Sequence, residues 1–174
     1  MAAPHADDIP ASAWIARFAP LVPAGPVLDL AAGGGRHSLL MRGLGHEVVA
    51  VDRDPSALVA RAVPGIAAIA EDLETGAVPA CLGRRYAAVV VANYLHRPIL
   101  PAIVGAVAPG GWLLYETFAT GNERFGRPSN PDFLLRPGEL LEAARGRLRV
   151  VAYEDLEVAE PRRAMVQRIA ARAD

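Results

Sequence analysis

The chain has 174 residues, of which 52% are hydrophobic and 21% are charged, and its formal net charge is −1. This composition is typical of a globular protein with a substantial core. The near-zero charge provides no basic surface for nucleic acid or for an anionic membrane, and no apolar run is long enough to cross a bilayer, so we expect neither as a partner.

Rare and missing residue types exclude several kinds of chemistry. The single cysteine, Cys81, excludes an internal disulfide and a multi-cysteine zinc site, and it fits a reducing cytoplasm. All eighteen basic residues are arginine, so the chain has no lysine for a Schiff base or for a phosphate-binding P-loop. The four histidines (His5, His37, His46 and His96) show no ligand spacing, and we expect no metal site.

The first 24 residues contain one short predicted helix. Ser12 is a suitable N-cap for a helix over Ala13–Phe18, which carries Trp14 among its apolar residues. Two interpretations remain open for this segment. It packs its aromatic side chains on the edge of a sheet, or it forms part of a lid over a ligand site.

The stretch Val27–His37 (VLDLAAGGGRH) predicts a strand, a glycine-rich turn and the start of a helix. Its first four residues form an apolar run typical of a buried parallel strand. Three consecutive glycines let the backbone approach a ligand closely, so the segment would form an adenine-cofactor cradle. The Gly-x-Gly-x-x-Gly pattern of dinucleotide sites is incomplete from either Ala31 or Gly33. A tight turn without a ligand is the alternative.

The second predicted strand, Glu47–Asp52, ends in an acid. An acid at this position, about 20 residues after the glycine turn, can accept hydrogen bonds from both ribose hydroxyls of an adenosine. Asp54 is the better cap for the helix that follows, with Pro55 at its first position. Asp52 is therefore expected to be left for the ligand.

Three further strands are predicted over Ile66–Glu71, Tyr86–Ala92 and Trp112–Phe118. The second of them is continuous, apolar and β-branched, which favours a central position in a parallel sheet. A helix is predicted over Pro98–Val107, and Pro109-Gly110-Gly111 is expected to end it before the last of these strands.

Residues 119–136 are polar and rich in Gly, Pro and Asn, and a connection of this length predicts an active-site loop. A helix follows over 137–144. Strands over Leu148–Leu156 and Arg163–Ala170 then form a closing antiparallel hairpin. We expect residues 1–174 to form a single domain.

The motif Asp29-x-Ala31-x-Gly33-x-Gly35 resembles motif I of the class I methyltransferases that use S-adenosylmethionine. The usual motif has glycine where this chain has Ala31, a departure of one methyl group. The acids after the second and third strands and the final hairpin follow the order of the same family. Within it, Asp29–His37 followed by Gly45–Val48 resembles the TehB-like, tellurite-resistance-related group of small bacterial methyltransferases.

The resemblance implies an α/β fold, a Rossmann-like three-layer sandwich with a mostly parallel seven-stranded sheet and a C-terminal antiparallel hairpin. It also implies S-adenosylmethionine as the cofactor. The residues expected to bind it are Asp29, Ala31, Gly33, Gly35, Arg36, Asp52, Arg53, Asp72, Leu73 and Asn93.

Individual roles follow from the same resemblance. Asp52 would bind the ribose, Asp72 the adenine amino group, and Leu73 the adenine ring. Asp29 would order the turn and interact with the methionine ammonium, and Arg36 would meet the methionine carboxylate or form a surface salt bridge. A solvated turn is the alternative for Asp72 and Leu73.

Four residues are candidates for the acceptor side. Tyr94 and His96 would face the acceptor, with His96 suited to remove a proton, although a half-buried structural histidine is the alternative. Arg124 and Arg127 would bind an anionic acceptor, or they would anchor their own loop.

The sequence therefore favours a cytoplasmic methyltransferase, monomeric or homodimeric, that acts on a small-molecule acceptor by in-line transfer. Two other functions stay open. One is a non-catalytic domain that binds S-adenosylmethionine or S-adenosylhomocysteine and acts through a partner protein. The other is an NAD-dependent or nucleotide-sugar Rossmann enzyme, which the incomplete fingerprint and the final hairpin disfavour.

Overall fold

The computed structural model describes residues 9–174, so the start of the N-terminal segment, with His5, lies outside the described residues. Seven strands form one sheet in the order β3-β2-β1-β4-β5-β7-β6. The strands are β1 (Val27–Leu30), β2 (Val48–Asp52), β3 (Ile66–Ala70), β4 (Tyr86–Ala92), β5 (Val107–Phe118), β6 (Arg149–Val158) and β7 (Ala164–Arg172). The α-helices are α1 (Ala13–Phe18), α2 (Arg36–Gly43), α3 (Ser56–Arg61), α4 (Leu100–Gly105) and α5 (Glu139–Ala144).

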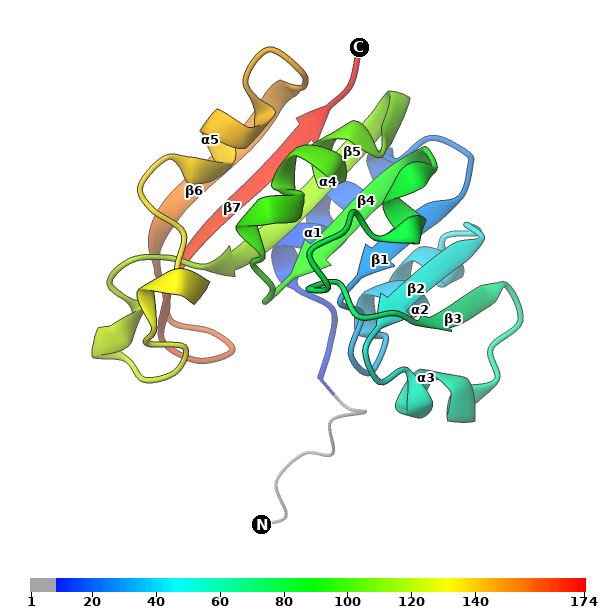
Figure 1. Ribbon diagram of the computed structural model, residues 1–174, viewed down its shortest axis with the longest axis horizontal. Helices are drawn as coiled ribbons and strands as arrows, with labels where there is room; N and C mark the ends of the chain where they lie inside the picture. The colour runs from blue at the N-terminus through cyan, green and yellow to red at the C-terminus, as the bar shows by residue number, and fades with distance from the viewer. Residues whose placement is uncertain (1–8) are drawn as a thin grey trace.

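The sheet has the predicted mixture of directions (Figure 1). Strands β1 to β5 pair in parallel, whereas β7 is antiparallel to both of its neighbours, β5 and β6. The carboxyl ends of β1, β2, β3 and β4 therefore meet at one end of the sheet, which is where open α/β sheets place their ligands. The prediction of a mostly parallel seven-stranded sheet that ends in an antiparallel hairpin is confirmed.

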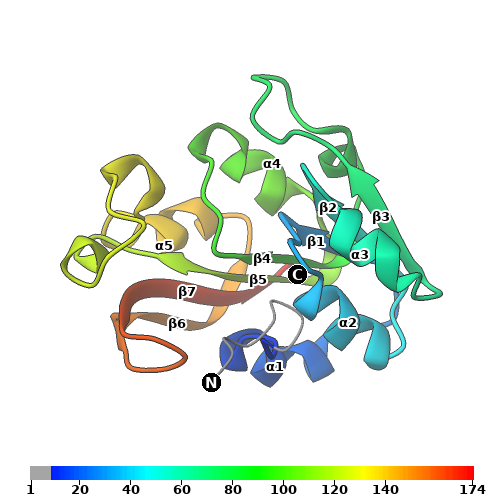
Figure 2. The same ribbon diagram turned by 90° about the horizontal axis from the view of Figure 1, so that it is seen from below.

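Helices cover both faces of the sheet (Figure 2). Helices α1 and α2 pack on one face with Trp14, Ile15 and Met41, and α4 and α5 pack on the other with Ile103 and Leu140. Strand β4 lies between these layers, and six of its seven residues are buried. This explains its continuous apolar sequence.

Helix α1 has the predicted N-cap, but it packs on a different part of the sheet than expected. The Ser12 hydroxyl accepts hydrogen bonds from the amides of Trp14 (3.2 Å) and Ile15 (3.4 Å). The Trp14 indole donates to the carbonyl of Ile169 in β7 (3.3 Å), and the Phe18 ring stacks on Trp112 of β5. Since β5 and β7 lie inside the sheet, α1 packs on its face, and the expectation of packing on an edge was wrong.

The fifth strand begins earlier than predicted. Helix α4 ends at Gly105, and β5 runs from Val107 through the Pro-Gly-Gly segment that was expected to precede it. The reason is pairing on both sides: Val107 pairs with Tyr86 of β4, and the two glycines pair with Ala173. Gly110 donates its amide hydrogen to the carbonyl of Ala173, and Ala173 donates to Gly111, both at 2.9 Å. Among residues 9–174, none of the helices combines the length and the apolar character that crossing a bilayer requires.

The position of α1 predicts a stability effect. Ile15 is 0% exposed, so Ile15→Ala should lower the free energy of unfolding by about 2–4 kcal/mol through the cavity that it leaves. Urea denaturation measures this. The control is Leu21→Ala, because Leu21 is 56% exposed and its loss should change stability by less than about 0.5 kcal/mol. Equal, small effects would show that α1 does not belong to the core.

Candidate functional site

The turn between β1 and α2 is left-handed at three positions. The φ angles are 56° at Ala31, 54° at Gly33 and 81° at Gly35. A Cβ atom at Gly33 would meet nothing within 4 Å, so this part of the turn faces open space. A Cβ atom at Gly35 would lie 2.5 Å from the Leu58 side chain of α3. One glycine therefore leaves room beside the turn, and the other lets two helices approach.

Ala31 and Asn93 are non-glycine residues with left-handed backbones, both at φ 56°. They follow β1 and β4, which are adjacent in the sheet. Such a conformation costs about 1–2 kcal/mol for alanine and less for asparagine. A third such residue, Ala62 (φ 47°), is the C-cap of α3. Backbone strain of this kind clusters at functional sites, and Ala31 and Asn93 lie at the carboxyl ends of two neighbouring strands.

Asp52, at the end of β2, ties the turn to its neighbours. Its carboxylate accepts hydrogen bonds from the amides of Gly33 (2.8 Å) and Asp54 (3.0 Å). Asp52 therefore also holds the glycine turn, a contact that its expected ligand role did not include. A carboxylate has about four acceptor positions, so two remain for a ligand. Asp54 accepts from the amide of Ser56 (3.1 Å), but α3 begins at Ser56 with Pro55 as its N-cap, so the predicted start of this helix was wrong by one position.

Asp29 lies beneath the turn and is fully buried. Its Oδ2 accepts a hydrogen bond from the Ser38 hydroxyl (2.6 Å), whereas its Oδ1 has no partner among residues 9–174. Burial raises the pKa of Asp29 to about 6, although the hydrogen bond from Ser38 opposes this effect. A buried carboxylate with an unpaired oxygen is unfavourable unless a donor or a cation approaches it.

An acidic pocket of about 360 Å³ lies at the carboxyl ends of β2 and β3. Its charged lining residues are Asp52, Arg53, Asp54, Glu71, Asp72 and Glu74. The Arg53 guanidinium lies 3.7 Å from the Asp72 carboxylate, and the buried Leu73 forms an apolar wall. In residues 9–174, no group of three or more His, Cys, Asp or Glu residues could hold a metal ion. The excess of carboxylates favours a ligand that donates hydrogen bonds and disfavours an anion.

A second pocket, of about 570 Å³, lies on the other side of Ala31. It is lined by the glycine turn, by Asn93, by Arg36 and by the segment Ile9–Ala11. Because Ala31 lines both pockets, they adjoin along the carboxyl end of β1.

The first two residues of α2 hold the N-terminal segment over this second pocket. The Arg36 guanidinium donates to the carbonyl of Pro10, and the amide of Ser12 donates to Nε2 of His37, both at 3.1 Å. Burial lowers the pKa of His37 to about 3, so its ring is neutral and can accept this bond. Residues 9–11 therefore line this pocket, where the lid interpretation expects part of the segment, whereas α1 packs on the face of the sheet.

The two candidate catalytic residues lie apart. Tyr94 lines the acidic pocket, and its hydroxyl is inaccessible to solvent with no hydrogen-bond partner in the described part of the chain. Burial and the nearby Glu74 carboxylate raise the pKa of Tyr94. His96 is half-buried and lines neither pocket. We had expected Tyr94 and His96 to lie together facing the acceptor. Tyr94 instead lines the same pocket as Asp52 and Leu73.

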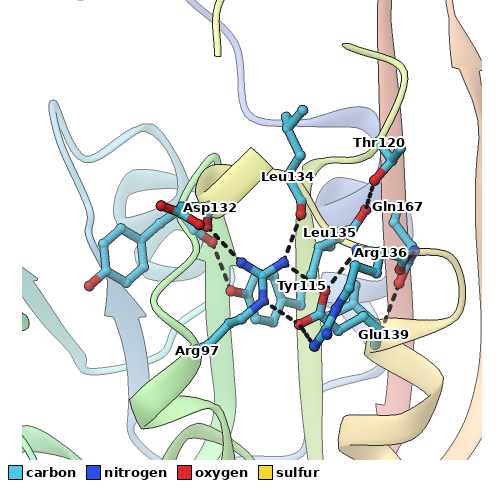
Figure 3. A network of polar contacts seen from close by, with 11 residues as sticks. Arg97, Tyr115, Thr120, Asp132, Leu134, Leu135, Arg136, Glu139 and Gln167 are labelled. Carbon is cyan, nitrogen blue, oxygen red and sulfur yellow. Dashed lines mark hydrogen bonds and ion pairs between the residues drawn. The ribbon is translucent and has the colours of Figure 1, made fainter. Parts of the chain in front are cut away.

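One arginine fastens the long loop to the segment between β4 and α4 (Figure 3). Arg97 forms two hydrogen bonds with the Glu139 carboxylate (2.7 and 3.0 Å) and donates to the carbonyls of Asp132 and Leu134 (both 2.8 Å). Burial alone would raise the pKa of Glu139, but hydrogen bonds from Arg97 and Arg136 lower it below its ordinary value. Sequence reasoning missed this pair, which no local pattern connects across 42 positions.

A buried glutamine completes the attachment of the loop. Gln167 of β7 is fully buried, accepts from the amide of Leu140 (2.8 Å) and donates to the carbonyl of Arg136 (3.0 Å) (Figure 3). Arg124 donates to the carbonyl of Gly121 (3.0 Å), and the backbone of Arg127 accepts from Arg162 (3.0 Å). Neither Arg124 nor Arg127 lines the two pockets. Arg124 therefore binds the backbone of its own loop, as the alternative interpretation expects.

Several solved structures share this fold. TehB from Haemophilus influenzae superposes with a TM-score of 0.71 at 19% identity, over 92% of this chain and 61% of TehB. The chain thus spans less than two thirds of that protein. The 1,6-didemethyltoxoflavin-N1-methyltransferase of Burkholderia thailandensis, with bound 1,6-didemethyltoxoflavin and S-adenosylhomocysteine, superposes with a TM-score of 0.64 at 21% identity, over 90% of this chain and 74% of that one.

A third neighbour is the N-methyltransferase NodS from Bradyrhizobium japonicum WM9, in complex with S-adenosylhomocysteine. It has a TM-score of 0.65 at 16% identity, over 91% of this chain and 83% of NodS. No protein-family model matches the sequence, and no curated protein matches it either. At these identities the likeness establishes the fold, and the site's own chemistry has to support the function.

The burial of Asp29 predicts a pH dependence. The carboxyl group of Asp29 binds its proton more tightly in the folded state than in the unfolded chain. Stability therefore falls as the pH rises from 3.8 to about 6. Asp29→Asn removes this loss, which is about 3 kcal/mol for a shift of this size. In urea titrations, the variant should gain stability over the wild type through that range and keep the gain above it. A difference that does not vary with pH would contradict the buried charge.

The Arg97–Glu139 pair predicts a second stability effect. Arg97→Met leaves the buried Glu139 without its partner, and we expect a loss of about 2–3 kcal/mol, less than for a fully buried pair. Thermal and urea unfolding measure it. The control is Arg145→Met, whose pair with Glu142 has side chains 74% and 62% exposed and should change stability by less than about 1 kcal/mol. Equal losses of stability in the two variants would contradict the claim that Arg97 stabilises the fold more than an exposed arginine does.

Proposed function

We propose that this protein transfers a methyl group from S-adenosylmethionine to a small-molecule acceptor. The observation that carries the proposal is the acidic pocket beside the glycine turn, with Asp52 at their junction. The cofactor supplies a methyl group on a sulfonium, which is already activated for transfer. The chain's contribution is to bind and orient the two reactants.

The acidic pocket suits an adenosine without phosphate groups. Asp52 has acceptor positions for the ribose hydroxyls, Asp72 can accept from the adenine amino group, and Leu73 offers an apolar surface to the ring. Five carboxylates line this pocket against one guanidinium. Such a lining repels a phosphate group placed in the pocket, and the incomplete Gly-x-Gly-x-x-Gly pattern of the turn favours S-adenosylmethionine over NAD.

The second pocket suits the amino-acid end of the same molecule. The Arg36 guanidinium can pair with a carboxylate, and the Asn93 carbonyl can accept from an ammonium group. Asp29 does not line the pocket, and its buried charge beneath the turn would favour a cation there. The open space beside Gly33 gives the ligand a close approach to the backbone. Because the two pockets adjoin at Ala31, one ligand can extend through both, with its sulfonium between them.

The acceptor would be bound by the candidate residues that the two cofactor pockets do not use. We assign Tyr94 to the nucleoside side and keep His96 as the residue for removing an acceptor proton; a soft anion needs no such base. The loop over 119–136, with Arg124 and Arg127, would border the acceptor. A neighbour of this fold, the 1,6-didemethyltoxoflavin-N1-methyltransferase, holds a small molecule together with S-adenosylhomocysteine, which supports a small acceptor here.

Calorimetric titration with S-adenosylhomocysteine, S-adenosylmethionine, NAD and ATP tests the proposal. We expect the first two to bind and the two phosphate-bearing ligands not to bind. Asp52→Ala should weaken binding by roughly 10- to 100-fold, as expected for lost hydrogen bonds to a charged group. The control is Glu142→Ala, whose side chain is exposed on α5 and should leave affinity unchanged.

Other outcomes separate the remaining functions. Binding of NAD but not of S-adenosylhomocysteine would contradict the proposal. Cofactor binding without methyl transfer to any acceptor in a broad panel would favour a non-catalytic domain that acts through a partner. The cytoplasmic location, the bacterial origin and the link to tellurite resistance stay predictions.

A further inference from the structure

The two edges of the sheet differ in their protection. Strand β3 forms one edge, and its sequence, IAAIA, contains no charged residue and no proline, while three of its five residues are exposed. Strand β6 forms the other edge and carries Arg149, Glu154, Asp155 and Glu157. Charged side chains on an edge prevent pairing with another chain, and an apolar edge without them invites it.

The backbone of β3 presents unpaired groups in a regular pattern. Gly65 accepts from Val48 and Glu71 donates to Asp52, so the odd-numbered residues form the ladder with β2. The even-numbered residues Ile66, Ala68 and Ala70 therefore direct their amides and carbonyls away from the sheet. The Ile66 amide is taken by the carbonyl of Val63 (3.2 Å), which leaves the other groups open.

We infer that β3 pairs with β3 of a second copy of this chain, antiparallel about a two-fold axis at Ala68. This register sets Ala68 opposite Ala68 and Ile66 opposite Ala70, so residues with outward groups face each other, as a hydrogen-bonded antiparallel pair requires. Ile69, which is 41% exposed, then lies opposite the small side chain of Ala67. The contact is self-complementary, as a two-fold interface must be.

The charges at the two ends of β3 are complementary in this arrangement. The acidic end, with Glu71, comes to lie opposite Gly65 of the second copy. Gly65 lies beside the Arg42 guanidinium, which donates to the carbonyl of Pro64 (2.8 Å) and forms an ion pair with Glu47 of its own chain (3.0 Å). Antiparallel pairing thus brings a carboxylate towards an arginine twice, once at each end.

Further exposed apolar side chains lie in the segments that precede and follow β3 in the chain. Val59 of α3 is 56% exposed and Val78, in the segment after β3, is 65% exposed. A second copy would shield part of this surface from water. The inference does not depend on the proposed function, since it uses only the edge strand and its neighbours.

Disulfide trapping tests the register. In a hydrogen-bonded antiparallel pair the facing Cα atoms lie about 5.5 Å apart, which suits a disulfide. Ala68→Cys should therefore form a covalent dimer under mild oxidation. Val151→Cys, at a residue 47% exposed on the opposite edge, should stay monomeric on a non-reducing gel, as should the wild type, whose Cys81 is buried. Equal cross-linking of both variants would overturn the register.

Sedimentation velocity tests the dimer itself without an added cysteine. The wild type should show a concentration-dependent dimer. Ala68→Pro should weaken it at least tenfold, because it removes an outward amide while sparing the ladder to β2; proline is tolerated at such edge positions. Circular dichroism checks that the fold is kept. A wild type that sediments as a monomer at every concentration would overturn the inference, as would a dimer that Ala68→Pro leaves unchanged in a folded protein.

Discussion

The hydrogen bond from the Gly33 amide to the Asp52 carboxylate holds the ends of two neighbouring strands together, and the site depends on it. Asp52 lines the acidic pocket, and Gly33 lines the second one, so this 2.8 Å contact joins the two. It fixes the glycine turn in the position that leaves space for a ligand. It also places a carboxylate where an adenosine would present its ribose hydroxyls.

Unfavourable features gather around this contact. Ala31 and Asn93 have left-handed backbones, and Asp29 is a buried carboxylate with one unpaired oxygen. Each lowers the stability of the folded chain, and the packed sheet with its two helical layers compensates for them. The fold in this way keeps a carboxylate and an open backbone at the place where a cationic, hydrogen-bond-donating ligand would bind.

Most of the sheet could be predicted because buried parallel strands have continuous apolar sequences. Tyr86–Ala92 matches β4 at both ends, and the acids after β2 and β3 do lie in one pocket. The errors concern contacts between distant residues. The beginning of β5 depends on its pairing with Tyr86 and with Ala173. The Arg97–Glu139 pair has no local pattern from which it could be inferred.

The most direct test is a crystal structure of the protein with S-adenosylhomocysteine. The account predicts ribose hydroxyls within hydrogen-bond distance of the Asp52 carboxylate, adenine against Leu73, and the amino-acid end in the pocket that Arg36 lines. A ligand bound elsewhere on the surface would contradict it. So would one whose nucleoside occupies the second pocket and leaves Asp52 without a contact.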